Sequence, residues 1–128
     1  MKRPLFGFVA AVFFVFAIVG PSFAHHGASM FDMTTLVTKA GTVTDFEFIN
    51  PHGMIYFDVK DENGNIVKWS AETRGGPGVL VRAGWTKDTL KAGDRITFVG
   101  HPAKNGSNNM RLAKVIFPDG RELSSDLK

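Results

Sequence analysis

The chain has 128 residues, which is enough for one domain with a single hydrophobic core. Its formal net charge is +3, but two cationic residues lie in an N-terminal segment that we expect to be removed. The remainder has 13 basic and 12 acidic residues, a net charge of +1, without the concentrated basic surface that nucleic-acid binding needs. Because the chain has no cysteine, it is also excluded from disulfide, thiolate, iron-sulfur and blue-copper chemistry.

Residues 1–24 have the pattern of a secretory signal peptide. Two cationic residues precede a continuous apolar run over residues 5–20, and Pro21 ends this run. Ser22 and Ala24 place small residues three and one positions before a cleavage site, so we expect cleavage after Ala24. An uncleaved anchor is the alternative, because the run is just short of a bilayer-spanning helix. We therefore predict an exported protein that meets the membrane only through this segment.

The rest of the chain is expected to hold a lead segment, one β domain and a short tail. Residues 25–36 have no clean periodicity and are predicted to be extended or irregular. The β domain is predicted over residues 37–123, and residues 124–128 read as a polar tail. We find no internal repeat and no inter-domain linker, so one packed domain is expected.

Five segments rich in β-branched and aromatic residues predict strands. A bulge is predicted at Gly41 in the first strand, and the pair Asn63-Gly64 predicts a tight turn between the second and third strands. Between the third and fourth strands, residues 79–85 follow Pro77 and predict one or two helical turns. The predicted strands are residues 37–49, 54–60, 66–72, 95–101 and 110–117.

Five strands with a short helix between the third and fourth is the order of an OB-like barrel. We therefore predict an all-β fold, a small five-stranded OB-like barrel preceded by a signal-peptide helix. A small β-sandwich and an SH3-like barrel are the alternatives. Trp69 and Trp85 are expected in the core, because large aromatic side chains supply much of the burial in a small domain.

Seven short phrases are distributed along the chain: Ala24-His25-His26, Phe31-Asp32, Gly41-Thr42-Val43, Asn50-Pro51-His52, Trp69-Ser70, Gly84-Trp85 and Gly100-His101-Pro102-Ala103. With these phrases the chain resembles an uncharacterised family of small exported proteins, known mainly from proteobacteria. The resemblance covers nearly the whole domain after the signal peptide. It implies a periplasmic location and an OB-like barrel, and it implies no established activity.

Four histidines are the first candidate metal ligands. His25 and His26 would begin the exported chain, where the terminal amine and the imidazole of one residue can chelate a metal together. His52 follows the first predicted strand and His101 ends the fourth, and the loops at these two places flank the same face of an OB barrel. Neither shares the strand parity of the core residues, so both are expected at the barrel rim.

The donor types at this predicted site favour copper. A nitrogen-rich tetragonal site suits Cu(II), which heads the divalent affinity order, and thioethers suit Cu(I). The candidate thioethers belong to Met30, Met33 and Met54. Asp32 is expected either to supply an oxygen ligand or to orient an imidazole. In the alternative interpretation the histidines are solvated or turn residues and the methionines fill the core.

The leading functional hypothesis is a small binding protein that holds a metal ion, copper being favoured, in metal handling or sensing. The alternative is a metal-free module whose rim binds a periplasmic protein partner or a small ligand. A copper oxidoreductase is a weaker third hypothesis, and no enzymatic activity is expected, because no substrate pocket or acid/base pattern is recognisable. The glycine-rich segment 74–78 lacks the ending of a phosphate loop, and residues 61–65 lack the spacing of a calcium loop.

Overall fold

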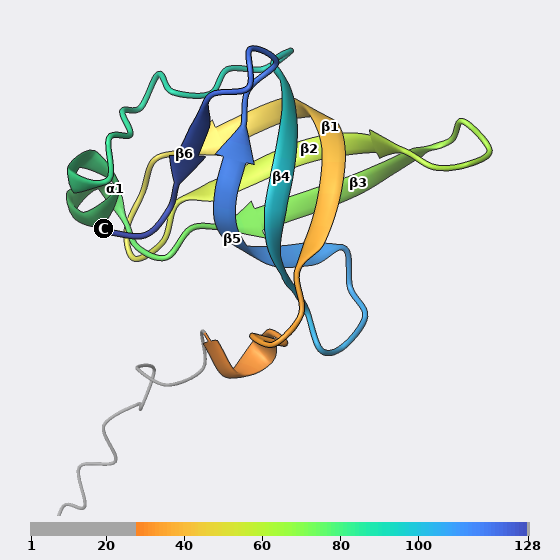
Figure 1. The fold of residues 1–128 in the computed structure, drawn as a ribbon, viewed down its shortest axis with the longest axis horizontal. Coiled ribbons are helices and arrows are strands. Elements are labelled where there is room, and N and C mark those ends of the chain that lie inside the picture. Colours follow the sequence, from red (N-terminus) through yellow and green to blue (C-terminus); the bar gives the residue numbers. More distant parts are fainter. Residues whose placement is uncertain (1–27, 128) are drawn as a thin grey trace, which may run out of the picture.

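Residues 28–127 are described by the structure, which is a computed structural model. They form a closed five-stranded barrel with one short helix between the third and fourth strands, so the predicted fold class is confirmed (Figure 1). The predicted signal peptide, residues 1–24, lies outside the described residues. Within residues 28–127 no helix has the length and apolar character needed to cross a membrane.

Eight elements follow one another along the described chain. A 3₁₀ turn precedes the barrel, a short helix interrupts it, and a short sixth strand follows it. In order they are η1 (Ala28–Met30), β1 (Val37–Glu47), β2 (Met54–Lys60), β3 (Ile66–Glu72), α1 (Pro77–Arg82), β4 (Arg95–Pro102), β5 (Asn109–Ile116) and β6 (Glu122–Ser124).

The barrel is closed by one parallel pairing. The sheet has the order β3-β2-β1-β4-β5-β6, in which every neighbouring pair is antiparallel. β5 also pairs in parallel with β3, with Ser70 opposite Asn109 and Glu72 opposite Arg111. Closure pairs the last three residues of β3 with the first three of β5 and brings together residues that are about 40 positions apart in the chain.

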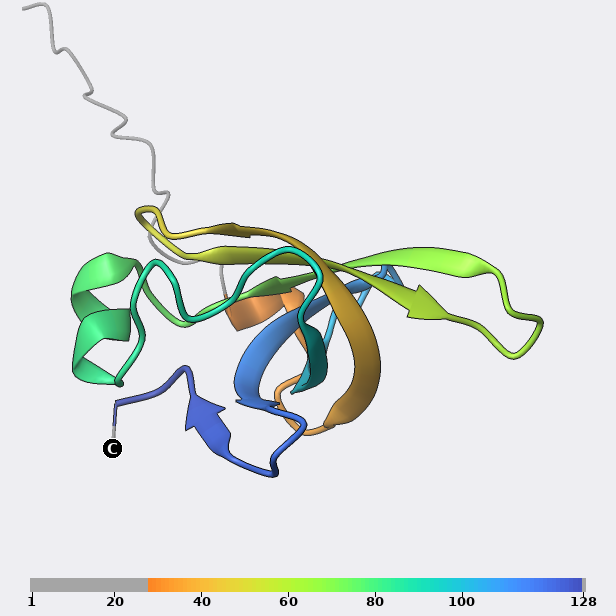
Figure 2. The same ribbon diagram turned by 90° about the horizontal axis from the view of Figure 1, so that it is seen from above.

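The β2–β3 hairpin forms as its sequence predicts. Ile55 and Phe57 alternate with more exposed neighbours and are buried inside the barrel. At the turn, Gly64 has a φ of 81°, a left-handed conformation that glycine adopts at low cost. Asp61 Oδ1 accepts hydrogen bonds from the backbone amides of Asn63 and Asn65, both at 2.8 Å. The tip of this hairpin projects away from the barrel on the side opposite α1 (Figure 2).

The predicted bulge at Gly41 is wrong in position. The register of β1 against β2 shifts between Val43 and Asp45, which leaves Thr44 as the extra residue. Position 41 requires a glycine for a different reason, because a Cβ there would lie 2.7 Å from Phe57 Cδ2 and 2.8 Å from the backbone oxygen of Asp58. The glycine therefore marks a close approach of β1 to β2 rather than the bulge itself.

The core is built around stacked aromatic rings. Phe57 and Phe98 face each other with ring centroids 3.8 Å apart, and Trp69 stacks on Phe57 at 6.4 Å. Trp85 is only 1% exposed, and its Nε1 donates to the backbone oxygen of Ser124 at 2.7 Å. The expected core position is therefore confirmed for Trp85, whereas Trp69 is half-buried and lies under the ammonium group of Lys39.

The packed part of the chain continues past residue 123, where the sequence suggested that the domain ends. β6 pairs with β5, and the buried Ser125 donates its hydroxyl proton to the backbone oxygen of Leu112. Asp126 Oδ1 lies 2.6 Å from Arg74 Nε. A three-residue strand has too few positions to show a period, so only its pairing with β5 identifies it.

Candidate functional site

His101 lies near the end of β4, opposite Arg111 of β5. Its Nδ1 is 2.8 Å from the backbone oxygen of Thr35. A carbonyl oxygen can only accept, so Nδ1 carries a proton and donates it. Nε2 then has no hydrogen-bond partner within residues 28–127. This is the arrangement by which proteins orient a histidine whose Nε2 binds a metal ion.

Asp32 fixes the turn that supplies the Thr35 carbonyl. Its Oδ1 accepts from the amide and the hydroxyl of Thr34 at 3.0 and 2.6 Å, and its Oδ2 accepts from the hydroxyl of Thr35 at 2.7 Å. These hydrogen bonds, with that of the Thr34 hydroxyl the strongest, lower the pKa of Asp32 from 3.8 to about 2. Both carboxylate oxygens are thus engaged in the turn, and Asp32 acts on His101 through Thr35.

The lead segment is attached to the same end of β4. Phe31 forms an isolated β-bridge with Ala103, and it is only 2% exposed. The amide of Asp32 donates to the oxygen of Pro102 at 2.9 Å, and the amide of Lys104 donates to the oxygen of Met30 at 2.9 Å. Residues 30–32 therefore run beside the strand end that carries His101.

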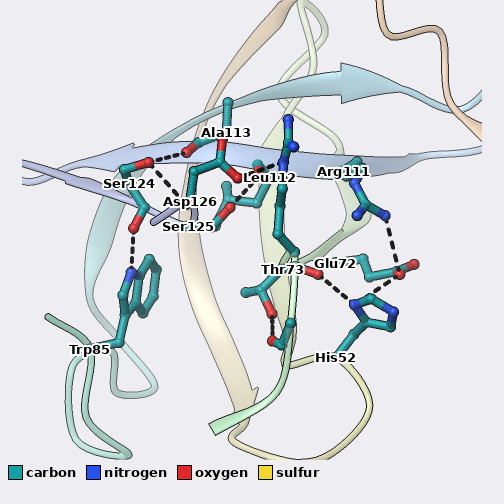
Figure 3. Close-up of polar contacts among 12 residues, drawn as sticks. His52, Glu72, Thr73, Trp85, Arg111, Leu112, Ala113, Ser124, Ser125 and Asp126 are labelled. Carbon is teal, nitrogen blue, oxygen red and sulfur yellow. Dashed lines mark hydrogen bonds and ion pairs between the residues drawn. The ribbon is translucent and has the colours of Figure 1, made fainter. Parts of the chain in front are cut away.

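His52 lies in the connection between β1 and β2 and has a similar backbone contact. Its Nδ1 is 3.0 Å from the backbone oxygen of Thr73, and it is 3.6 Å from Glu72 Oε1. Thr73 is itself buried, and its hydroxyl lies within hydrogen-bonding distance of the backbone oxygens of Gly53 and Gly75. Figure 3 shows the imidazole between Thr73 and Glu72. The carbonyl again requires a proton on Nδ1, which leaves Nε2 as the nitrogen that can bind a ligand.

A row of strand partners runs between the two histidines across the barrel surface. In the strand register His101 lies opposite Arg111, Arg111 opposite Glu72, and Glu72 opposite Met54, so these four side chains share one face of the sheet. Arg111 Nη1 lies 3.9 Å from Glu72 Oε1, which also contacts His52 (Figure 3). We call His52, Glu72, Arg111 and His101 the histidine rim.

The structure does not gather the predicted ligands into one cluster. Among residues 28–127 there is no group of three or more His, Asp or Glu side chains that could hold a metal ion. Met30 and Met33 are exposed beside the end of β4, whereas Met54 is half-buried at the start of β2. His25 and His26 lie outside the described residues.

Glu72 and Arg111 are the rim residues that the sequence did not identify. Strand alternation predicts that Glu72 points outward, but it cannot tell which side chain lies beside it. Arg111 is 39 residues away, and only the parallel pairing of β3 with β5 brings it there. Its side chain is 11% exposed, and Nε and Nη1 are buried without a hydrogen-bond partner in the described part of the chain.

Comparison with known proteins gives a family without an assigned activity. Residues 13–111 match the sequence model of a family described as a family of unknown function (DUF6152). The match covers both rim histidines, Glu72 and Arg111. No curated protein matches the chain.

Proposed function

The chain belongs to the family of unknown function DUF6152, and from its own residues we propose that it is a periplasmic metal-binding protein that favours copper. In this proposal the signal peptide is removed after Ala24, and the terminal amine and imidazole of His25 chelate Cu(II). His26 and His101 supply further imidazole nitrogens. The protein holds the metal for handling or sensing and does not turn over a substrate.

The attachment of the lead segment beside His101 is the observation that carries this proposal. The Phe31–Ala103 bridge attaches the lead segment to Ala103, which follows His101 by two residues in the sequence. His26 lies five residues before Phe31, so its Cα is within about 18 Å of the bridge even if the chain is fully extended. That distance allows the new N-terminus to reach the rim, and it favours His101 over His52 as the ligand from the barrel.

The chemistry of the donors supports copper. With Nδ1 of His101 held by a carbonyl 2.8 Å away, the lone pair of Nε2 points in a fixed direction. Imidazole and amine nitrogens suit Cu(II). The exposed thioethers of Met30 and Met33 lie on the same segment and suit Cu(I). The site therefore has donors for both oxidation states of one metal.

The first experiment tests the terminal chelate. The N-terminal residue of the exported protein is identified by mass spectrometry, and the protein is titrated with Cu(II) beside a version whose terminal amine is blocked by acetylation. We expect the acetyl group to weaken binding at least tenfold, because the amine of His25 can then no longer bind the metal. Equal affinities would rule out the terminal chelate.

The second experiment asks what the barrel contributes. A synthetic peptide of residues 25–34 contains the terminal histidines without the rim. We expect the whole exported chain to bind Cu(II) more tightly than this peptide does. If the affinities are equal, His101 is not a ligand. If neither binds more tightly than an unrelated peptide, a metal-free interaction module is the better description. With a reductant, oxygen consumption by the copper-loaded protein that exceeds that of the same amount of copper alone would contradict the non-enzymatic role.

A further inference from the structure

A groove of about 800 Å³ lies on the outer face of the barrel, away from the histidine rim. Its floor follows the strand pairing: Thr42 of β1 lies opposite both Asp58 of β2 and Arg95 of β4. In the next row Thr97 lies opposite both Ala40 and Ile116. Paired residues point to the same face of a sheet, so the two rows form one continuous surface, which we call the outer groove.

The outer groove and the histidine rim lie at opposite ends of the same strands. β4 contributes its first residues, 95–97, to the groove and His101 to the rim. β5 contributes Ile116 to the groove and Arg111 to the rim. In Figure 1 the groove residues of β4 and β5 lie toward the end of the barrel that is away from η1. A ligand in the groove would therefore not occupy the proposed metal site.

Two cations at the groove have no counterion of their own. Lys60 and Arg95 are exposed, and neither has an ion pair or a side-chain hydrogen bond within residues 28–127. Asp58, the acidic residue of the lining, lies 3.7 Å from the ammonium nitrogen of Lys68, which is outside the groove. The lining is therefore positive overall, and its free charges are available to a ligand.

Hydroxyl groups and an apolar wall complete the groove. The side chains of Thr42 and Thr97 make no hydrogen bond in the described part of the chain. Residues 116–118 form an apolar wall on the β5 flank of the groove, and Ile66, which is 54% exposed, lies on the opposite flank beside Lys60. A volume of about 800 Å³ falls within the range of small-molecule sites, which combine apolar walls with a few polar groups that orient the ligand.

We propose that the outer groove binds a small amphipathic oxyanion, which has a carboxylate, phosphate or sulfonate head and an apolar body. The head lies between Lys60 and Arg95 and accepts hydrogen bonds from Thr42 and Thr97. The body lies against the wall formed by residues 116–118. This site is independent of the proposed metal site.

The test uses 8-anilinonaphthalene-1-sulfonate as the probe and the whole exported chain. Fluorescence gives its affinity, and decanoate, decyl phosphate and decanol are added as competitors. We expect decanoate or decyl phosphate to displace the probe at least tenfold better than decanol. The two acids distinguish a carboxylate ligand from a phosphate ligand. Equal competition by decanol would overturn the proposal, because the charge of the head would then be irrelevant.

Amide chemical shifts of the unaltered protein locate the probe. We expect the largest changes at residues 40–42, 95–97 and 116–117. Changes concentrated at other residues would overturn the assignment. Because this measurement needs no substitution, it also separates the groove from binding of the probe to a partly unfolded core.

Charge variants then test the two cations. The double substitution Lys60→Gln with Arg95→Gln is expected to weaken probe binding at least tenfold. The matched control, Lys87→Gln with Lys91→Gln, removes the same charge from the exposed connection before β4 and is expected to change the affinity less than twofold. Equal losses of probe affinity in the two double variants would show that only net charge matters, which would contradict the proposal. Thr97→Val, which is close in size, is a second variant should the double one fold poorly.

Discussion

The histidine rim and the outer groove differ in whether their polar side chains have partners within the protein. At the rim, His52 and His101 each donate Nδ1 to a backbone oxygen, at 3.0 and 2.8 Å. In the groove, Lys60 and Arg95 have no partner among the described residues. Internal bonds fix the direction of the donor atoms, which suits a small ion of strict geometry. The free cations of the groove can instead form ion pairs with the anionic group of a larger ligand.

The two regions also differ in what they contribute to stability. The rim contains Arg111, whose buried Nε and Nη1 have no hydrogen-bond partner in the described residues and whose nearest carboxylate belongs to Glu72. The residues that line the groove are exposed or half-buried, except for the buried Ile96, and the structural constraint there is the close backbone contact at Gly41. The comparison can be tested by changing one residue of each region.

Glu72→Ala is expected to produce the largest loss of stability. It leaves the mostly buried guanidinium of Arg111 without a counterion, which costs about 3 kcal/mol when such a pair is broken. Urea denaturation measures the change. Glu122→Ala removes the exposed 2.9 Å contact with Lys114 and should cost less than about 1 kcal/mol. Similar losses for the two variants would show that the Glu72–Arg111 pair has no special importance.

Gly41→Ala is expected to destabilise the groove side of the barrel by about 1 to 3 kcal/mol. The new methyl group would lie within 2.8 Å of Phe57 and of the Asp58 backbone, so β1 and β2 must move apart. Gly78→Ala is the matched control, because a Cβ there meets no atom within 4 Å and alanine favours the helix. Thermal unfolding of both proteins should rank them in this order, and an unchanged midpoint for Gly41→Ala would contradict it.

His101→Gln is expected to weaken Cu(II) binding about tenfold, by removing one imidazole ligand. His52→Gln should change the affinity less than about twofold, because His52 lies at the other end of the rim from the lead segment. Isothermal titration of the exported protein gives both values. A larger effect at His52 would move the proposed site to the β1–β2 connection.

Asp32→Asn is expected to have the smallest effect on copper, a loss of a few fold, because it loosens the turn that holds His101. The folded-state pKa of Asp32, about 2, lies below its ordinary value of 3.8. Its stabilising contribution is therefore fully present above about pH 4 and is lost as the pH falls toward 2. The Thr34 amide shift should report a midpoint near 2 that is absent from the asparagine variant. A midpoint near 4 would contradict the hydrogen bonds assigned to this turn.

Much of the fold could be predicted from local patterns. The alternation around Ile55 and Phe57 identifies β2 and its buried face, and Asn63-Gly64 identifies the turn that follows. The alternation along β4 also predicts correctly that His101 points away from the core side chains of Ile96 and Phe98. These features depend on a period or a turn within a few residues, so the sequence contains the information directly.

The neighbours of those side chains could not be predicted in the same way. The Glu72–Arg111 contact requires the parallel pairing of β3 with β5, and the outer groove requires the register of four strands. The bulge between Val43 and Asp45 shifts this register by one residue without a glycine to mark it. Strand pairing over long separations is set by closure of the barrel and not by any local preference.

Local sequence patterns identify the five strands of the barrel, the short helix, the outward direction of His52 and His101 and the donor types available for a metal. The folded barrel shows which carbonyls hold their imidazoles, that the lead segment lies beside His101, and that two free cations share a groove. The physical reason is that periodicity and turn chemistry act within a few residues of one another, whereas contacts between strands exist only after the barrel has closed.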